Sequence, residues 1–277
     1  TTRVLRPRTR VVLHNHGWEQ RAWQIERTLG PGNRLAPRTT IRARAVLFPL
    51  IRGALVLSHG CVCGTVSEIR WARGRRSLRP ARFFYVPNGV AVPDTCFWTG
   101  RDTPPQFLGV GPHTWKKNLA GSVATLLAVR KHLPEASLVL AGCGEGALKD
   151  PLLQSPNTRT WITPIPSVAP TAMPDRYRSC PYLIASSRYE GGHPLSILEA
   201  MAHGCLVFAS DIPSHREIIR DGRNGFILSG DAQCDGARIA ELILGRETEH
   251  VRHEAWKTVQ RHRWERQGRR LARVVES

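Results

Sequence analysis

The fold of this 277-residue chain is decided by residues 182–204, whose sequence is YLIASSRYEGGHPLSILEAMAHG. The opening letters, YLIASS, form an apolar run typical of a buried strand. A glycine pair then favours a loop, and a second apolar segment ends at Gly204, which suits the left-handed residue that commonly follows a helix. Pro194 suits the first helical position, because its missing N–H and fixed φ cost nothing there. The stretch therefore predicts a strand, a glycine-rich loop and a helix.

The start of this predicted helix is a candidate anion site. Backbone N–H groups of residues 192–196 are expected to lack helical partners, and such groups attract phosphate. Glu190 and Glu199 lie on either side of them in the sequence. An anion site flanked by carboxylates suits a ligand that carries both phosphate and hydroxyl groups, such as a sugar nucleotide. The candidate donor-binding residues in this stretch are Gly192, His193, Pro194, Leu195, Ser196 and Glu199.

The same passage resembles the E-x7-E signature of retaining GT-B glycosyltransferases of the group 1, or family 4, type. The resemblance implies that Glu190 lies by the transferred sugar and that Glu199 accepts hydrogen bonds from the nucleotide ribose. Eight residues separate the two carboxylates here, where the family has seven. A bulge at Gly191 and Gly192 is one way for Glu190 to reach the family position.

Residues 106–118, QFLGVGPHTWKKN, resemble the next part of the family pattern. There a strand leads into Gly-Arg, a short loop and a lysine, and the arginine and lysine hold the donor diphosphate. Gly111 matches the glycine and Lys117 the lysine, with Lys116 as a competing candidate. Pro112 stands in the arginine's place, so we expect a donor affinity weakened by about 1.5–3 kcal/mol, the contribution of one charged hydrogen bond. The alternative for Lys117 is an exposed lysine at a helix start.

A histidine after a strand of the first domain faces the donor sugar in this family. His16, followed by glycine, is the best match here, and His14 is the second. The alternative is an ordinary histidine at a strand end. The family also implies a metal-independent mechanism, so we expect neither a metal nor a cofactor. His14 and His16 alone give two ligands, too few for a metal site.

Strands that alternate with helices from residue 106 to residue 230 predict a parallel sheet with helices on both faces. The alternation therefore predicts an α/β fold, and the resemblance implies that this fold is GT-B-like and of Rossmann type. The resemblance is thin before residue 86, so the first domain is expected to lack its early strands, as in a fragment or a reduced variant. The expected organisation is a partial N-terminal, acceptor-side domain at 1–92, a linker at 93–105, a nucleotide-sugar-binding domain at 106–246, and a C-terminal helix at 247–277 that packs back on the first domain.

The composition is strongly basic, with 40 Lys and Arg against 22 Asp and Glu and a net charge of +18. This excess fits a solvated, arginine-rich surface, or attraction to anionic lipid headgroups or substrates. Nucleic acid is not an expected partner, since the sequence has no recognition-helix, zinc-finger or RNP pattern. The apolar run 45–57 is too short to span a bilayer and predicts a buried strand or helix.

The seven cysteines form no C-x-x-C pair and are expected to be reduced thiols. This indicates a cytoplasmic protein, with a peripheral position at the inner face of the membrane as a further option.

The resemblance implies a retaining glycosyltransferase, for which we expect a role in cell-envelope or polysaccharide biosynthesis. Its donor would be a nucleoside-diphosphate sugar, and its acceptor a glycan, a lipid or a small molecule. Glu190 and His16 are the expected catalytic residues. The alternative is a sugar-nucleotide-binding remnant without transferase activity, which Pro112 and the extra loop residue favour. A basic nucleic-acid module, the third reading, would bind in a salt-sensitive way without competition from nucleotide sugars.

Overall fold

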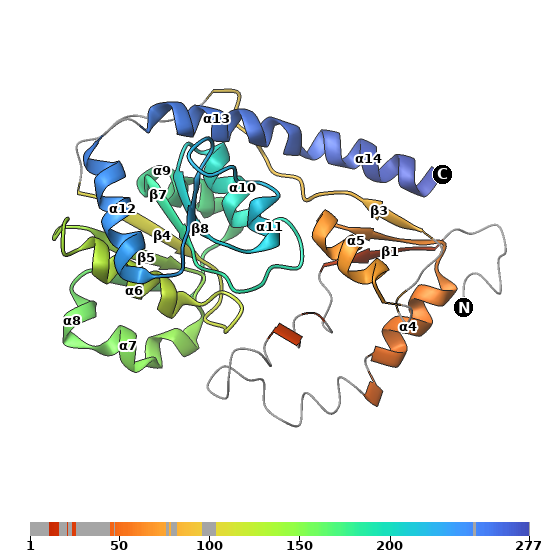
Figure 1. Cartoon of the computed structure of the whole chain (residues 1–277), viewed down its shortest axis with the longest axis horizontal. Helices are drawn as coiled ribbons and strands as arrows, with labels where there is room; N and C mark the ends of the chain where they lie inside the picture. The colour runs from red at the N-terminus through yellow and green to blue at the C-terminus, as the bar shows by residue number, and fades with distance from the viewer. Residues whose placement is uncertain are drawn as a thin grey trace. The chain divides into compact units, whose positions relative to one another are not determined.

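The computed structural model describes residues 11–16, 21, 24–25, 45–46, 48–75, 78, 82–95, 104–245 and 248–276. Its internal contacts divide the chain into two units (Figure 1). Unit 1 comprises Thr1–Gly89, Tyr189–His193 and Trp264–Ser277, and unit 2 comprises Val90–Arg188 and Pro194–Arg263. Residues 96–103 of the expected linker lie outside the described residues.

Unit 2 is built on a six-stranded sheet in which neighbouring strands run parallel, in the order β6-β5-β4-β7-β8-β9. Apolar runs form these strands, and parallel strands need such runs because both of their faces are covered. The strands are β4 (Gln106–Val110), β5 (Ser137–Ala141), β6 (Ile162–Ile165), β7 (Tyr182–Ala185), β8 (Leu206–Ser210) and β9 (Phe226–Leu228).

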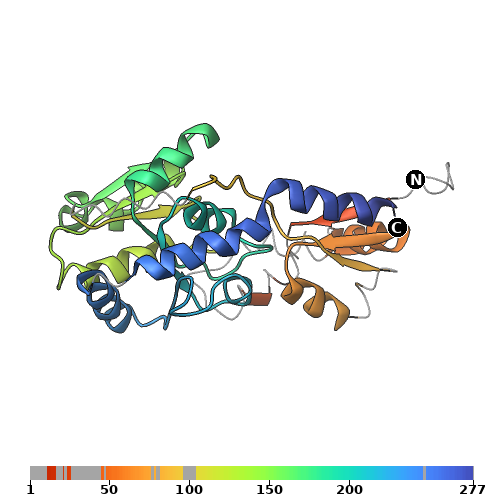
Figure 2. The same cartoon turned by 90° about the horizontal axis from the view of Figure 1, so that it is seen from above.

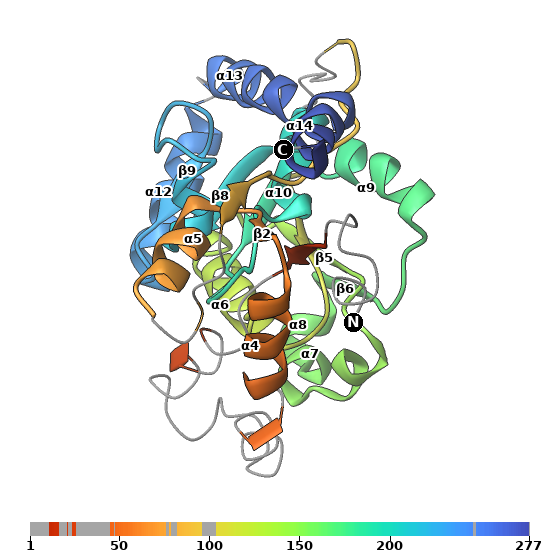
Figure 3. The same cartoon turned by 90° about the vertical axis from the view of Figure 1, so that its right-hand side faces the viewer.

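Alternate side chains of each strand enter two separate hydrophobic cores. On β4, Phe107 joins the first core and Leu108 the second, and on β8, Phe208 and Val207 divide in the same way. Helices α6 (Leu119–Val129) and α12 (Ala232–Leu244) close the first core. Helices α9 (Met173–Ser179), α10 (Leu195–Ala202) and α13 (Glu249–Val259) close the second. In Figure 3, α12 and α9 lie on opposite sides of the strands. The predicted α/β architecture, a parallel sheet with helices on both faces, is confirmed.

Several short helical segments complete unit 2. They are η4 (Glu145–Lys149), α7 (Pro151–Gln154), α8 (Pro156–Arg159), η5 (Pro170–Ala172), α11 (Pro213–Arg216) and η6 (Gln260–His262).

Unit 1 contains a three-stranded parallel sheet in the order β1-β2-β3. Its strands are β1 (Val12–Asn15), β2 (Gly60–Cys63) and β3 (Phe83–Tyr85). The middle strand is buried throughout, and its two cysteines pack with Leu55, Ile69 and Ala72 in a small core. The unit's helices are α4 (Phe48–Leu57), α5 (Val66–Arg73) and α14 (Trp264–Glu276), orange and blue in Figure 2.

The expectation of a buried element at residues 45–57 is wrong. The run forms α4, in which Leu55 is buried, whereas Leu50 is 63% exposed and Val56 62% exposed. The apolar residues of α4 follow one another around the whole helix instead of recurring along one stripe, so a single packing face cannot cover them. Among the helices that the structure describes, none is long and apolar enough to cross a membrane.

The two ends of α10 differ in how well the sequence predicted them. Gly204 has the left-handed backbone expected after the helix, with φ +78. Pro194 is the cap that precedes the helix, not its first residue, because its ψ of 121 is extended. Its carbonyl accepts the first helical bonds, from the amides of Ile197 and Leu198.

Candidate functional site

The order of strands in unit 2 marks one place where a ligand is expected. From β4 the chain continues to β5 and β6 on one side of the sheet, and β7, β8 and β9 then extend the other side. The loops that follow β4 and β7 therefore leave adjacent strands in opposite directions. In open α/β sheets such a switch point, at the carboxyl ends of the strands, is where ligands bind.

Hydrogen bonds fix these two loops against each other. The amide of Arg188 donates to the carbonyl of Lys116 over 2.8 Å. The side-chain amide of Asn118 donates to the carbonyl of Ser186 over 3.1 Å, and the hydroxyls of Ser122 and Ser186 are also hydrogen-bonded. Asn118 itself has a left-handed backbone, with φ +50. Lys117 thus lies in a segment held on both sides.

The structure brings together the predicted pair Gly111 and Lys117. Gly111 has φ +123, and a Cβ atom added to it would lie 2.9 Å from Cε of Lys117 and 3.2 Å from Cδ. The aliphatic stem of the lysine therefore runs directly over the glycine backbone. A side chain at position 111 would displace the lysine, so the observed position of Lys117 requires glycine at 111. Pro112, in the place of the family's arginine, is exposed.

Glu199 is a half-buried carboxylate on α10 whose position depends on Tyr177. The hydroxyl of Tyr177 donates to Oε2 over 2.7 Å. Within the described part of the chain, Oε1 accepts no such bond, so it is available to a ligand. Burial raises the pKa of Glu199, and the hydrogen bond from Tyr177 opposes that rise.

Tyr177 and His203 support Glu199, and neither is among the residues predicted from the sequence. The two rings stack with centroids 5.7 Å apart, and Nδ1 of His203 lies 2.9 Å from the backbone carbonyl oxygen of Glu199. Burial, with the charge of Glu199, raises the pKa of Tyr177. His203 stands four residues after Glu199, one helical turn on, which is a signal that the sequence contained. No local signal points to Tyr177, which lies on α9.

The predicted residues of the glycine-rich loop belong to unit 1. The side-chain amide of Asn88 donates to the carbonyl of His193 over 2.7 Å, and the hydroxyl of Tyr189 lies 3.5 Å from Oε2 of Glu68. A Cβ atom on Gly64 would lie 3.2 Å from the Cα of Gly192, so two glycine backbones approach closely here. These contacts hold the loop within unit 1.

The predicted residues are therefore divided between the units. Unit 2 holds the switch-point residues and the start of α10, and unit 1 holds the loop residues and the histidine of β1. Gly111, Lys117, Pro194, Leu195, Ser196 and Glu199 belong to unit 2, and His16, Glu190, Gly192 and His193 belong to unit 1.

His14 and His16 lie together at the end of β1. Nδ1 of His14 and Nε2 of His16 are 2.9 Å apart, which fits a hydrogen bond between the two rings. Burial, and then the neighbouring His16, lower the pKa of His14. Among the described residues, no group of three His, Cys, Asp or Glu side chains could hold a metal ion. The absence of a metal from the mechanism stays a prediction.

The sequence matches one protein family over the range that contains these unit 2 residues. The family model described as Glycosyl transferases group 1 matches residues 104–244, about half of the chain. This chain belongs to the family of group 1 glycosyl transferases. The matched range contains each predicted site residue of unit 2 and the glycine-rich loop, while His16 lies outside it.

One relative of this chain is EpsD of Bacillus subtilis (strain 168), a candidate glycosyltransferase by its name. The two are 31% identical over 137 residues, which cover 46% of this chain and 33% of EpsD. The chain thus matches about a third of the length of this relative.

Three of the solved structures with the same fold are the following. Sucrose-phosphate synthase from Thermosynechococcus elongatus has a TM-score of 0.78 and 16% identity, covering 99% of this chain and 69% of its own. HepE of Anabaena, in complex with UDP and glucose, has a TM-score of 0.71 and 16% identity, covering 99% of this chain and 73% of its own. The pneumococcal O-GlcNAc transferase GtfA, in complex with UDP and GlcNAc, has a TM-score of 0.72 and 17% identity, covering 96% and 51%. At these identities the likeness establishes the fold, and the predicted GT-B-like class is confirmed.

Proposed function

We propose that this glycosyltransferase takes its sugar from a nucleoside-diphosphate sugar and transfers it with retention of configuration. The observation that carries the proposal is the pairing of Lys117 with Gly111 at the switch point of a sheet whose helix α10 carries the anchored carboxylate Glu199. A cation and a hydroxyl-binding carboxylate are the two groups that a nucleotide's diphosphate and ribose require.

In this proposal the residues of unit 2 hold the nucleotide. Oε1 of Glu199 accepts a hydrogen bond from the ribose, while Tyr177 keeps Oε2 in place. Lys117 and the amides at the start of α10, those of Leu195 and Ser196, face the diphosphate. As the sugar leaves, negative charge grows on that diphosphate, and fixed positive charges and N–H dipoles stabilise it. No metal is needed for this step.

The residues of unit 1 are proposed to act at the sugar. Glu190 would lie by the transferred sugar, and His16 would contact it, with His14 as the alternative. The acceptor would be a glycan, a lipid or a small molecule. Because the structures of HepE and GtfA contain UDP, a uridine nucleotide is the first donor to test.

A peripheral contact with anionic membrane on the cytoplasmic side is also part of the proposal. Two features support it, namely the net charge of +18 and the exposed apolar side chains of α4 in unit 1. Positive charge draws a protein to anionic headgroups, and apolar side chains then enter the boundary of the acyl chains.

The proposal is tested by calorimetric titration of the purified chain with UDP, GDP, ADP and their common sugars. We expect one base to bind, and Glu199→Ala to abolish that binding while the circular dichroism spectrum stays unchanged. Glu135→Ala is the matched control, because it removes an exposed carboxylate elsewhere in unit 2. No binding of any nucleotide, or equal binding by the Glu199 variant, would reject the donor site.

Turnover is a separate measurement. The anomeric signals of the product in an NMR spectrum distinguish retention from inversion, since the two products differ at the anomeric carbon. Nucleotide binding without any product from a panel of acceptors would favour the remnant instead, a reading that Pro112 supports by removing one cation from the diphosphate site.

A further inference from the structure

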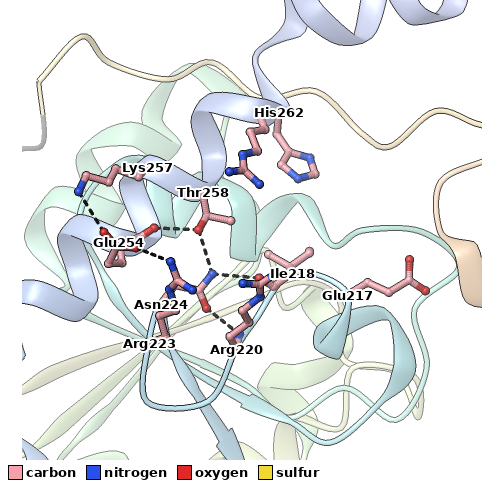
Figure 4. A pocket seen from close by; sticks show the side chains of 10 residues that line it. Glu217, Ile218, Arg220, Arg223, Asn224, Glu254, Lys257, Thr258 and His262 are labelled. Atoms are coloured by element: carbon pink, nitrogen blue, oxygen red, sulfur yellow. Dashed lines mark hydrogen bonds and ion pairs between the residues drawn. The ribbon is translucent and has the colours of Figure 1, made fainter.

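Unit 2 contains a cavity that none of the predicted donor residues lines. Its volume is about 430 Å³, and it lies between the segment 217–224 and the end of α13 with η6 (Figure 4). This volume is within the range of about 300–1,000 Å³ that small-molecule sites occupy. The cavity is therefore large enough for a small organic ligand.

The wall of this cavity is held rigidly by Asn224, which is 4% exposed. Its side-chain oxygen accepts from the amide of Arg220 over 2.7 Å, and its side-chain nitrogen donates to the carbonyl of Ile218 and to the hydroxyl of Thr258, each over 3.0 Å. The hydroxyl of Thr258 in turn donates to the carbonyl of Glu254. The loop and α13 thus form one hydrogen-bonded frame, which Figure 4 shows as dashed lines.

This frame presents more positive than negative charge to the cavity. Arg220 and Arg223 lie on the loop, and Lys257 and Arg261 lie one helical turn apart on the other wall. A single carboxylate, that of Glu254, pairs with both Lys257 at 3.0 Å and Arg223 at 3.4 Å. These two cations, Lys257 first, lower the pKa of Glu254, so it stays ionised.

The lining as a whole carries an excess of positive charge. Among the residues that the structure describes, none pairs with the guanidinium of Arg220. Figure 4 shows the carboxylate of Glu217, the second acid of the lining, pointing away from the side chains of Lys257 and Glu254. Four cations against two carboxylates leave two positive charges in excess, with histidine taken as neutral.

We propose that this cavity is a second ligand site, and that it binds a phosphomonoester. A phosphomonoester carries a charge of about −1.5 to −2 at pH 7, which matches the excess. The planar guanidinium groups of Arg220 and Arg261 suit two-pronged hydrogen bonding to phosphate oxygens. Because the frame is already hydrogen-bonded, the protein loses less conformational entropy when a ligand binds. The site is separate from the donor site and does not depend on the proposed transferase activity.

The test is calorimetric titration of the full chain with glycerol 3-phosphate and with inorganic phosphate, at constant ionic strength. We expect saturable binding by the wild type and a loss of about tenfold or more in the double variant Arg220→Gln with Arg261→Gln, which removes charged hydrogen bonds. The matched control is Arg159→Gln with Arg266→Gln, because these exposed arginines lie outside the cavity and give the same change in charge. The control is expected to bind as the wild type does.

Further titrations distinguish this site from the donor site, and a soluble phosphomonoester from a lipid phosphate. Saturating UDP should leave glycerol 3-phosphate binding unchanged, and so should Lys117→Ala, because the donor site is elsewhere. Tighter binding to phosphatidate vesicles than to glycerol 3-phosphate, lost in the same double variant, would identify a lipid phosphate as the source. Equal binding of sulfate, equal losses in both double variants, or displacement by UDP would each overturn the proposal. If the double variant does not fold, the single exposed substitution Arg220→Gln is expected to show the same loss.

Discussion

At the scale of single residues, the position of Lys117 depends on the absence of a side chain beneath it. We expect Gly111→Ala to weaken UDP binding, because the new Cβ would lie 2.9 Å from Cε of Lys117 and push the lysine aside. Uridine binding should change much less, since the proposal places the lysine at the diphosphate. Titration with UDP and with uridine measures both effects.

Gly142→Ala is the control for the glycine variant. Gly142 also has a left-handed backbone, with φ +71, but an added Cβ would meet no atom within 4 Å. The control therefore carries backbone strain without displacing a lysine. Equal losses of UDP affinity in the two variants would mean that strain, and not the position of Lys117, is responsible.

Removing the lysine itself gives a related prediction. Lys117→Ala should weaken UDP binding by about ten- to a hundredfold, the contribution of a charged hydrogen bond, and leave uridine binding unchanged. Lys149→Ala removes an exposed lysine of η4 and serves as the control. A loss that is equal for UDP and uridine would place Lys117 away from the diphosphate.

The buried carboxylate of Glu199 is predicted to lower the free energy of unfolding at neutral pH, although it is needed for the proposed nucleotide binding. Burial raises its pKa, so the folded state holds a proton at pH values where the unfolded state has lost it. Stability attributable to this group therefore falls as the pH rises from the ordinary carboxyl pKa through the raised one. Glu199→Gln removes the charge and keeps an oxygen for Tyr177. It should raise the melting temperature at neutral pH, with an advantage that shrinks in acid, while UDP binding is lost.

The measurement is the melting temperature of the wild type and of Glu199→Gln across a pH series. If the stabilisation of Glu199→Gln relative to the wild type grew as the pH fell, its sign would be opposite to the one predicted, and the prediction would be wrong.

At the scale of elements, α6 and α12 pack so closely that one position must be glycine. A Cβ atom on Gly236 would lie 2.4 Å from the Cβ of Ala128 and 2.8 Å from the amide nitrogen of Val129. We expect Gly236→Ala to destabilise unit 2 by about 1–3 kcal/mol, because the two helices would have to move apart. Chemical denaturation measures the loss.

The control for this prediction is Gly268→Ala on α14. No atom lies within 4 Å of an added Cβ there, so alanine should stabilise the helix by about 0.5–1 kcal/mol. If both variants were stabilised, α6 and α12 would not be in contact as described.

The elements that the sequence predicted best are those with local signals. Apolar runs are enough to identify the strands of unit 2, and Gly204 marks the end of α10 by its conformational freedom alone. The exposed α4 was mispredicted because an apolar run does not reveal whether a partner covers it. The contact of Tyr177 with Glu199, and that of Asn88 with His193, join residues 22 and 105 positions apart. Such pairs follow from the three-dimensional path of the chain, for which a single sequence has no local signal.

At the scale of the whole molecule, the net charge of +18 and α4 predict binding to anionic vesicles. Sedimentation with phosphatidylglycerol vesicles should decrease as salt rises, because salt screens the attraction. Leu50→Ser should weaken it further by removing an apolar side chain that is 63% exposed. Leu244→Ser, at a residue of unit 2 that is 62% exposed, is the matched control. Equal effects of the two substitutions would remove α4 from the proposed contact.

The central place of β4 in its sheet has a consequence for biosynthesis. A chain is made from its N-terminus, so β4, β5 and β6 are complete before β7 has been synthesised. Until then one edge of β4 has no neighbour, and an open edge of this kind is prone to aggregation. The strand that covers this edge, β7, also forms the switch point at which the proposed donor site lies. We therefore expect nascent chains that end before Tyr182 to require a chaperone. Ribosome-bound chains should acquire nucleotide binding only at a greater length, once α10 with Glu199 has also been synthesised.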